Sequence, residues 1–198
     1  MPGAVVVFAV GNSSRGDDAL GPLLLERLAA WLDAEGRRGE FELIDDFQLQ
    51  IEHAFDLAGQ RLALFIDAGA GTPAPCVFHA VSPGTTLATH STHALSPAAV
   101  LAVYREFAHN EPPPAFVLCV RGEGFGLGDG LSAAAHEHLD AAWQVLRCLC
   151  RTPEVAAWTA AATEFPAQVA RAPAGATSAA QGARDGRATC VATGEAAT

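Results

Sequence analysis

The chain has 198 residues, half of them hydrophobic, which is enough for one domain with a sizeable buried core. Twelve basic residues, all of them arginine, oppose 22 acidic residues and leave a net charge of −10. This balance argues against nucleic acid as a partner, because phosphates require a basic face. A basic peptide would be attracted instead.

Five cysteines are an odd number and include no Cys-x-x-Cys pair, so neither a disulfide framework nor a zinc ribbon is predicted. The first residues lack the basic stretch of a secretion signal, and no apolar run approaches the roughly 18 residues of a membrane span. We therefore expect a cytoplasmic monomer with reduced thiols that binds no membrane.

Apolar runs predict three strands in the first third of the chain, at residues 5–10, 41–44 and 62–66. Helices are expected between them, because apolar residues recur at helical spacing from Leu20 to Trp31 and from residue 49 to 58. The unbroken apolar character of 62–66 is typical of a strand buried on both faces. Right-handed crossovers through the helices predict the central strand order 2-1-3.

The apolar run 77–81 follows the third strand without a helix between, so an antiparallel edge strand is expected there. Ser96 and Pro97 are a typical N-cap and first residue for a helix that extends to Phe107. A strand at 116–120 and a helix at 132–150 follow. The sequence thus predicts an α/β three-layer sandwich, with a five-stranded, mostly parallel twisted sheet, one antiparallel edge strand and helices on both faces.

The composition changes after residue 150, where alanine fills 17 of the last 48 positions and four arginines balance four acids. We therefore divide the chain into an α/β domain at 1–150 and an Ala-rich, mobile C-terminal tail at 151–198. Truncation after Pro153 is expected to leave stability unchanged. A short helix near 153–163, with Trp158 docked on the domain, is the open alternative.

Ligands of open parallel sheets bind beyond the carboxyl ends of the strands, which directs attention to the loops there. Asp17 and Asp18 follow the first strand, and Asp67 directly follows the third. An acid at the end of a buried strand loses hydration unless a metal, a cation or amide donors face it. The alternative is that these acids only cap a helix or their own loop.

His90 and His93 precede the helix at 97 and compete for a third ligand position, although a loop histidine is more often simply solvated. Two carboxylates and one imidazole would form an oxygen, oxygen, nitrogen set for a divalent ion, with open positions for water or substrate. A dinucleotide-binding fingerprint belongs to the loop after the first strand, whereas the Gly-rich segment 122–130 follows the last one. We therefore expect a flexible loop there.

The combination Gly11-Asn12-x-x-x-x-Asp17-Asp18-x-x-Gly21, Asp67 and His93 resembles the nickel–iron hydrogenase maturation endopeptidases over about residues 4–150. The segment Asp45-Asp46-Phe47-Gln48-Leu49-Gln50-Ile51-Glu52-His53 is similar to the branch that serves soluble, NAD-linked hydrogenases. The chain departs from the family at three positions: Ala9, where Gly is frequent, Ser14, where Leu is usual, and Ala19, where Gly commonly follows the acids.

The resemblance implies a twisted five-stranded sheet between helices and an endopeptidase that removes the C-terminal extension of the hydrogenase large-subunit precursor after nickel insertion. By motif match, it implies that Asp18, Asp67 and His93 are the catalytic, metal-contacting side chains. Nickel would be carried by the precursor as the recognition element and not held tightly by the enzyme. Two alternatives stay open: an assembly chaperone that docks the precursor without cutting it, and another hydrolase with its own bound metal.

Overall fold

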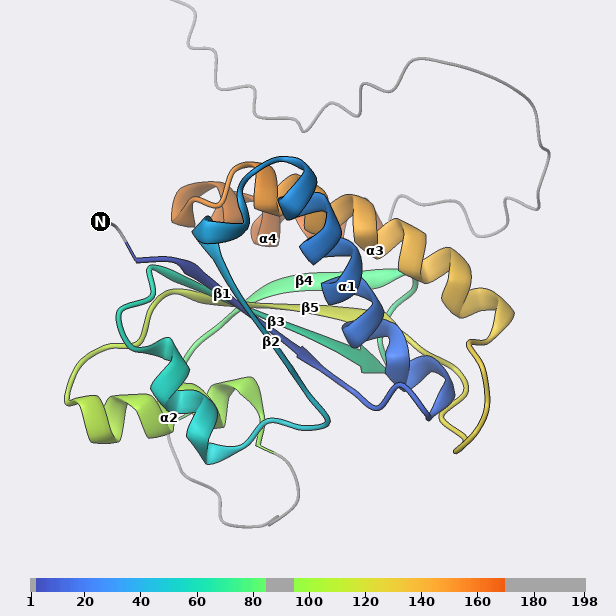
Figure 1. Ribbon diagram of the computed structural model, residues 1–198, viewed down its shortest axis with the longest axis horizontal. Helices are drawn as coiled ribbons and strands as arrows, with labels where there is room; N and C mark the ends of the chain where they lie inside the picture. The colour runs from blue at the N-terminus through green and yellow to red at the C-terminus, as the bar shows by residue number, and fades with distance from the viewer. Residues whose placement is uncertain (1–2, 85–94, 170–198) are drawn as a thin grey trace, which may run out of the picture.

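One five-stranded sheet forms the centre of the computed structural model, which describes residues 3–84 and 95–169. The strands are β1 (Val5–Val10), β2 (Phe41–Asp46), β3 (Leu62–Gly69), β4 (Cys76–Val81) and β5 (Ala115–Arg121). Their order is β2-β1-β3-β5-β4, and only the β4–β5 pair is antiparallel (Figure 1). The predicted order 2-1-3 and the antiparallel edge strand are both confirmed.

Helices cover both faces of the sheet, so the predicted three-layer α/β architecture is confirmed (Figure 1). The α-helices are α1 (Leu20–Ala34), α2 (Pro97–Ala108), α3 (Ala133–Arg151) and α4 (Val155–Val169). Three 3-10 helices are η1 (Gly16–Ala19), η2 (Arg38–Glu40) and η3 (Ile51–Leu57). The helix expected at 49–58 is therefore the shorter 3-10 helix η3, whereas α2 begins after Ser96 as predicted, with the Ser96 hydroxyl accepting from the amide of Ala99 at 3.2 Å.

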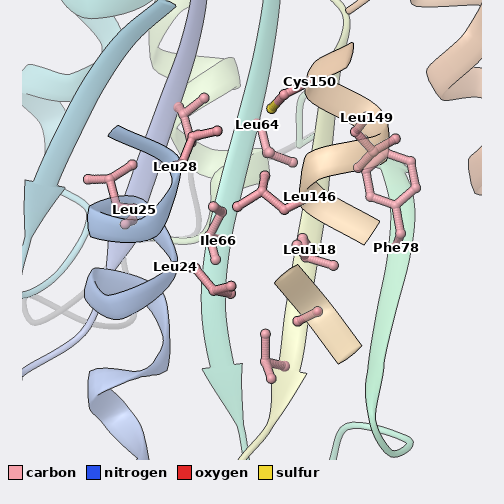
Figure 2. Packing of buried hydrophobic residues seen from close by; sticks show 14 of the residues in the cluster. Leu24, Leu25, Leu28, Leu64, Ile66, Phe78, Leu118, Leu146, Leu149 and Cys150 are labelled. Atoms are coloured by element: carbon pink, nitrogen blue, oxygen red, sulfur yellow. The ribbon is translucent and has the colours of Figure 1, made fainter. Parts of the chain in front are cut away.

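Successive side chains of each strand point to opposite faces of the sheet, so the buried apolar residues form two clusters, one on each face. Leu64 and Ile66 of β3 face α1 and α3, where they pack against residues such as Leu24 and Leu146 (Figure 2). Phe65 faces the opposite side, which η3 and α2 cover. Because successive side chains of a strand point to opposite faces, Asp67 shares the η3–α2 face of the sheet with Phe65.

Helix α4 corrects the expectation of a mobile tail for residues 155–169. Trp158 is fully buried, and its indole nitrogen donates to the carbonyl of Leu149 at 3.0 Å. Its ring meets Phe78 of the edge strand β4 and Phe116 of β5 edge-on, with centroids 6.2 and 5.4 Å away. Trp158 thus covers the apolar side chains of β4 and β5 on the face of the sheet that carries α3. This is the alternative that the sequence left open, a helix with Trp158 docked on the domain.

Residues 170–198, the remainder of the predicted tail, lie outside the described part of the chain. Among the helices of residues 3–84 and 95–169, none combines the length and the apolar character needed to cross a membrane.

Candidate active site

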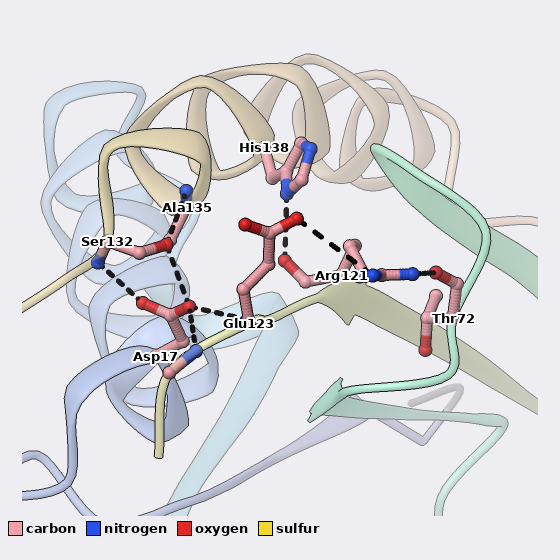
Figure 3. A network of polar contacts seen from close by, with 8 residues as sticks. Asp17, Thr72, Arg121, Glu123, Ser132, Ala135 and His138 are labelled. Carbon is pink, nitrogen blue, oxygen red and sulfur yellow. Dashed lines mark hydrogen bonds and ion pairs between the residues drawn. The ribbon is translucent and has the colours of Figure 1, made fainter. Parts of the chain in front are cut away.

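The acidic pair after β1 consists of one buried and one half-buried carboxylate. Asp17 is fully buried and accepts hydrogen bonds from the amides of Glu123, Gly124 and Ser132 at 2.7 to 2.9 Å. The Ser132 hydroxyl donates a fourth bond at 2.9 Å (Figure 3). Burial alone would raise the pKa of Asp17, but these hydrogen bonds outweigh it and lower the pKa below its ordinary value. Asp17 therefore joins η1 to the distant β5–α3 loop and is not available for chemistry.

The Gly-rich segment 122–130 is held in place by the loop after β1. The Gly16 amide donates to the carbonyl of Asp129 at 3.1 Å, and the Gly128 amide donates to the carbonyl of Ser14 at 2.7 Å. The expectation of a flexible loop is therefore wrong, because its backbone is paired with a segment more than 100 residues away in sequence, which no local pattern reveals.

Asp18 is half-buried, and its Oδ2 accepts from the amide of Asn12 at 2.9 Å. Gly11 makes this turn possible: its φ is +146°, and a Cβ there would overlap the carbonyl oxygen of Asp18. A Cβ at Gly21 would lie 2.5 Å from the carbonyl oxygen of Val10, so glycine lets α1 begin directly against the end of β1. The glycines of the motif thus fold the loop back and hold Asp18 at the carboxyl end of the sheet.

Asp67 lies on the strand beside this turn. It follows Ile66, which pairs with Ala9 of β1, and its Oδ1 accepts from the amide of Ala68 at 2.7 Å. The side chain reaches solvent, but surrounding protein partly desolvates it. This desolvation, together with the negative charge of Asp18, raises the pKa of Asp67 despite the Ala68 amide. The structure thus places Asp18 and Asp67 within range of each other's charge at the carboxyl end of β1 and β3.

His93, the third predicted ligand, and its rival His90 both lie outside the described residues. Within residues 3–84 and 95–169, no three His, Cys, Asp or Glu side chains form a group that could hold a metal ion. Asp18 and Asp67 alone therefore represent the predicted triad in the described structure, and the role of His93 stays a prediction.

Cys119 is a neighbour of the candidate site that the sequence analysis did not identify. It pairs with Asp67 across β3 and β5, on the same sheet face, and its Sγ lies 3.0 Å from the Thr72 hydroxyl. Burial raises the pKa of this thiol, and the charge of Asp67 adds to the effect, although the Thr72 hydrogen bond opposes it. The register of β3 with β5 is the signal that could have located Cys119.

The segment singled out at 45–53 packs beside the Asp18 loop, since the Gly11 amide donates to the carbonyl of Asp46 at 3.1 Å. His53 is buried against Phe8 with ring centroids 5.5 Å apart. Its Nδ1 accepts from the Gln50 amide at 2.9 Å, and its Nε2 lies 3.5 Å from the Asp46 carboxylate. His53 therefore organises this segment from within.

No family model and no curated protein sequence matches the chain. Solved structures do match. The [NiFe] hydrogenase maturation protease HycI from Thermococcus kodakarensis KOD1 is 22% identical, with a TM-score of 0.54 over 72% of this chain and 89% of its own. The hydrogenase maturating endopeptidase HybD from E. coli is 23% identical, with a TM-score of 0.55 over 75% of this chain and 93% of its own. The chain has the fold of these hydrogenase maturation proteases. The endopeptidase HycI from Escherichia coli shares it as well, at 21% identity and a TM-score of 0.53 over 74% of this chain and 90% of its own.

Proposed function

We propose that the protein is an endopeptidase that removes the C-terminal extension from the precursor of a nickel–iron hydrogenase large subunit after nickel insertion. The observation that carries the proposal is the proximity of Asp18 and Asp67, whose charges interact. Asp18 lies in η1 directly before α1, and Gly21 in the first turn of α1 packs against the carbonyls of Val10 at the end of β1 and of Ile66, which precedes Asp67 on β3. The motif resemblance and the fold shared with the maturation proteases HycI and HybD support the same function.

The chemistry of the proposed reaction follows from two carboxylates whose negative charges interact. Asp18 and Asp67 repel one another unless a cation lies between them, and nickel carried by the precursor would supply that cation. With His93 as a third contact, the protease would recognise metal loading as well as peptide sequence. An ion held there polarises a nearby carbonyl or water and so lowers the barrier to peptide hydrolysis.

The substrate hydrogenase is proposed to belong to the soluble, NAD-linked class. The support is the similarity of segment 45–53 to that branch of the family and its position next to the Asp18 loop. Processing of precursors from a soluble and from a membrane-bound hydrogenase, measured side by side, tests this assignment. Equal rates on both would contradict it.

The decisive experiment incubates the purified protein with nickel-loaded and nickel-free precursor and measures the mass of the large subunit. We expect loss of the C-terminal extension only from the nickel-loaded precursor. Stable binding of precursor without a change in its mass would instead indicate an assembly chaperone.

A resident-metal hydrolase is distinguished by metal analysis of the same preparation. We expect little zinc or nickel to survive dialysis against a chelator, because Asp18, Asp67 and His93 provide no thiolate ligand. Stoichiometric metal after dialysis, together with cleavage of the nickel-free precursor, would indicate that class of enzyme.

A further inference from the structure

Large apolar side chains are exposed on η3, on α2 and on the loop between β2 and η3. The exposed fraction is 71% for Phe47, 55% for Ile51, 61% for Phe55 and 40% for Phe107. Phe55 of η3 and Phe107 of α2 contact each other with ring centroids 4.6 Å apart, so the two elements share one outer surface. We call these four residues the η3–α2 patch.

The patch is held by a rigid framework. Leu49, which lies between Phe47 and Ile51 in the sequence, is buried in the core. The Leu95 amide donates to the Leu49 carbonyl at 3.1 Å. The Asp46 carboxylate accepts from the Phe47 amide at 2.6 Å and from the Gln50 side chain at 3.2 Å. These contacts fix the backbone that carries Phe47 and Ile51, so less backbone freedom is lost when a partner binds.

The patch lies on the sheet face to which Asp67 belongs. The inner side of η3 and α2 packs against Phe8 and Phe65, and Asp67 follows Phe65 by two residues on the same face. The hydrogen bond from Gly11 to Asp46 also connects the loop after β2, where Phe47 lies, to the turn that holds Asp18. Phe55 and Phe107 lie near the ends of η3 and α2 that lead into β3 and β5, whereas Asp67 is at the carboxyl end of β3. A protein that covers the patch would therefore reach the two carboxylates with a flexible terminal segment.

The charge around the patch indicates the chemistry of the partner. Residues 45–57 contain four acids (Asp45, Asp46, Glu52 and Asp56) and no Arg or Lys. On α2, Glu106 is exposed, whereas Arg105 is half-buried and its guanidinium donates to the carbonyl of Gly84 at 3.4 Å. Two copies of such a surface repel one another, so a second copy of this chain is disfavoured and a basic partner surface is favoured.

We propose that the η3–α2 patch is the docking surface for the folded body of the precursor, which presents apolar side chains surrounded by Arg or Lys. This inference rests on the proposed function. It adds a recognition site, distinct from the two carboxylates, that holds the precursor while its C-terminal segment is cut.

The test measures KM and kcat for the nickel-loaded precursor with the double variant Phe55→Ser/Phe107→Ser. We expect KM to rise about tenfold with kcat unchanged, because neither ring touches the two carboxylates. The melting temperature should fall only slightly, because the rings are largely exposed and lose only the contact with each other and that of Phe107 with Tyr104. The matched control is Val155→Ser on α4, which removes another 40%-exposed apolar side chain from the opposite face of the sheet. Its KM should stay within about twofold of the wild-type value.

A second measurement follows the charge around the patch. KM of the wild-type protein should rise with salt concentration, and Glu52→Gln should weaken that dependence. An unchanged KM in the double variant, while the wild-type protein processes the precursor, would overturn the docking site and leave the proposed function intact. A wild-type protein that neither binds nor cuts the precursor would overturn both. Self-association that the double variant abolishes would assign the patch to a second copy and overturn the inference.

Discussion

At the scale of single residues, the two neighbouring acids of the motif, Asp17 and Asp18, have different roles: Asp17 is structural, and Asp18 is proposed to contact the metal. Asp17 is buried under four hydrogen bonds from the β5–α3 loop, whereas Asp18 has one amide partner and remains open to solvent. The motif match already selects Asp18 of the two acids, and the fold supplies the physical reason, because it buries Asp17 and leaves Asp18 accessible. Variants of Asp17 and Asp18 should therefore fail in different ways.

Asp17→Asn should lower the free energy of unfolding by about 2 to 4 kcal/mol, because an amide cannot accept all four hydrogen bonds and leaves buried donors unpaired. Asp18→Asn should leave that free energy within about 0.5 kcal/mol of the wild-type value, as expected for a solvent-accessible position, and should abolish processing. Urea unfolding and cleavage rates of both variants test the distinction. Equal losses of stability would contradict the separate duties.

Asp67→Asn should reduce cleavage of the nickel-loaded precursor by orders of magnitude, because it keeps the shape of the side chain but removes the anionic donor. Stability should not fall, since the change also removes the repulsion between Asp67 and Asp18. Cleavage rates, with circular dichroism to confirm the fold, are the measurement. A wild-type rate would show that Asp67 does not take part in the chemistry.

His93→Ala should weaken recognition of the nickel-loaded precursor about as strongly as the loss of Asp67, whereas His90→Ala should have little effect. The measurement is the cleavage rate of each variant at several precursor concentrations. If His90→Ala caused the larger loss, the assignment between the two histidines would be reversed.

At the scale of elements, local pattern predicts most of the sheet but not its long-range anchors. The apolar runs and the Ser96-Pro97 start of α2 are local features, and the structure confirms the elements that they predict. The Ala-rich composition favours a tail over a packed helix at α4, and the burial of Trp158 against Phe78 and Phe116 decides for the docked alternative. Likewise, the conformation of segment 122–130 is fixed by hydrogen bonds from its backbone amides to the carboxylate of Asp17, more than 100 residues away in sequence.

Truncation after Pro153 should now lower the melting temperature by many degrees, contrary to the expectation from composition, because it removes the Trp158 side chain that covers Phe78 and Phe116. Trp158→Ala alone should cost about 3 to 5 kcal/mol, and Trp158→Phe less, because it keeps an aromatic ring in the core. Thermal unfolding of the three proteins checks this. A truncated protein as stable as the full chain would show that α4 contributes nothing to the fold.

At the scale of the whole molecule, the two sheet faces serve different purposes. Helices α1, α3 and α4 bury the larger cluster and stabilise the fold, while the η3–α2 layer borders Asp67 and exposes the apolar patch. The face that carries α1, α3 and α4 also contains two buried free thiols, Cys76 and Cys150. We expect these thiols to make global stability sensitive to alkaline pH.

Burial raises the pKa of Cys76 to about 12 and that of Cys150 to about 12, although Arg37 opposes the shift at Cys150. In the unfolded chain both thiols would ionise near their ordinary pKa of about 8.5. The contribution of the two protonated thiols to the stability of the fold is therefore complete below about pH 8.5 and is lost as the pH rises toward 12, because the unfolded state then binds fewer protons than the folded state.

Urea unfolding at intervals from about pH 8 to about pH 10.5 should show a free energy of unfolding that falls by up to about 1.4 kcal/mol per pH unit for each thiol. Cys150→Ala provides the control: whatever its effect at neutral pH, it should make the slope above about pH 9 shallower. An unchanged slope in Cys150→Ala would show that this thiol ionises equally in both states and is not shielded by the packing of α3 against the sheet.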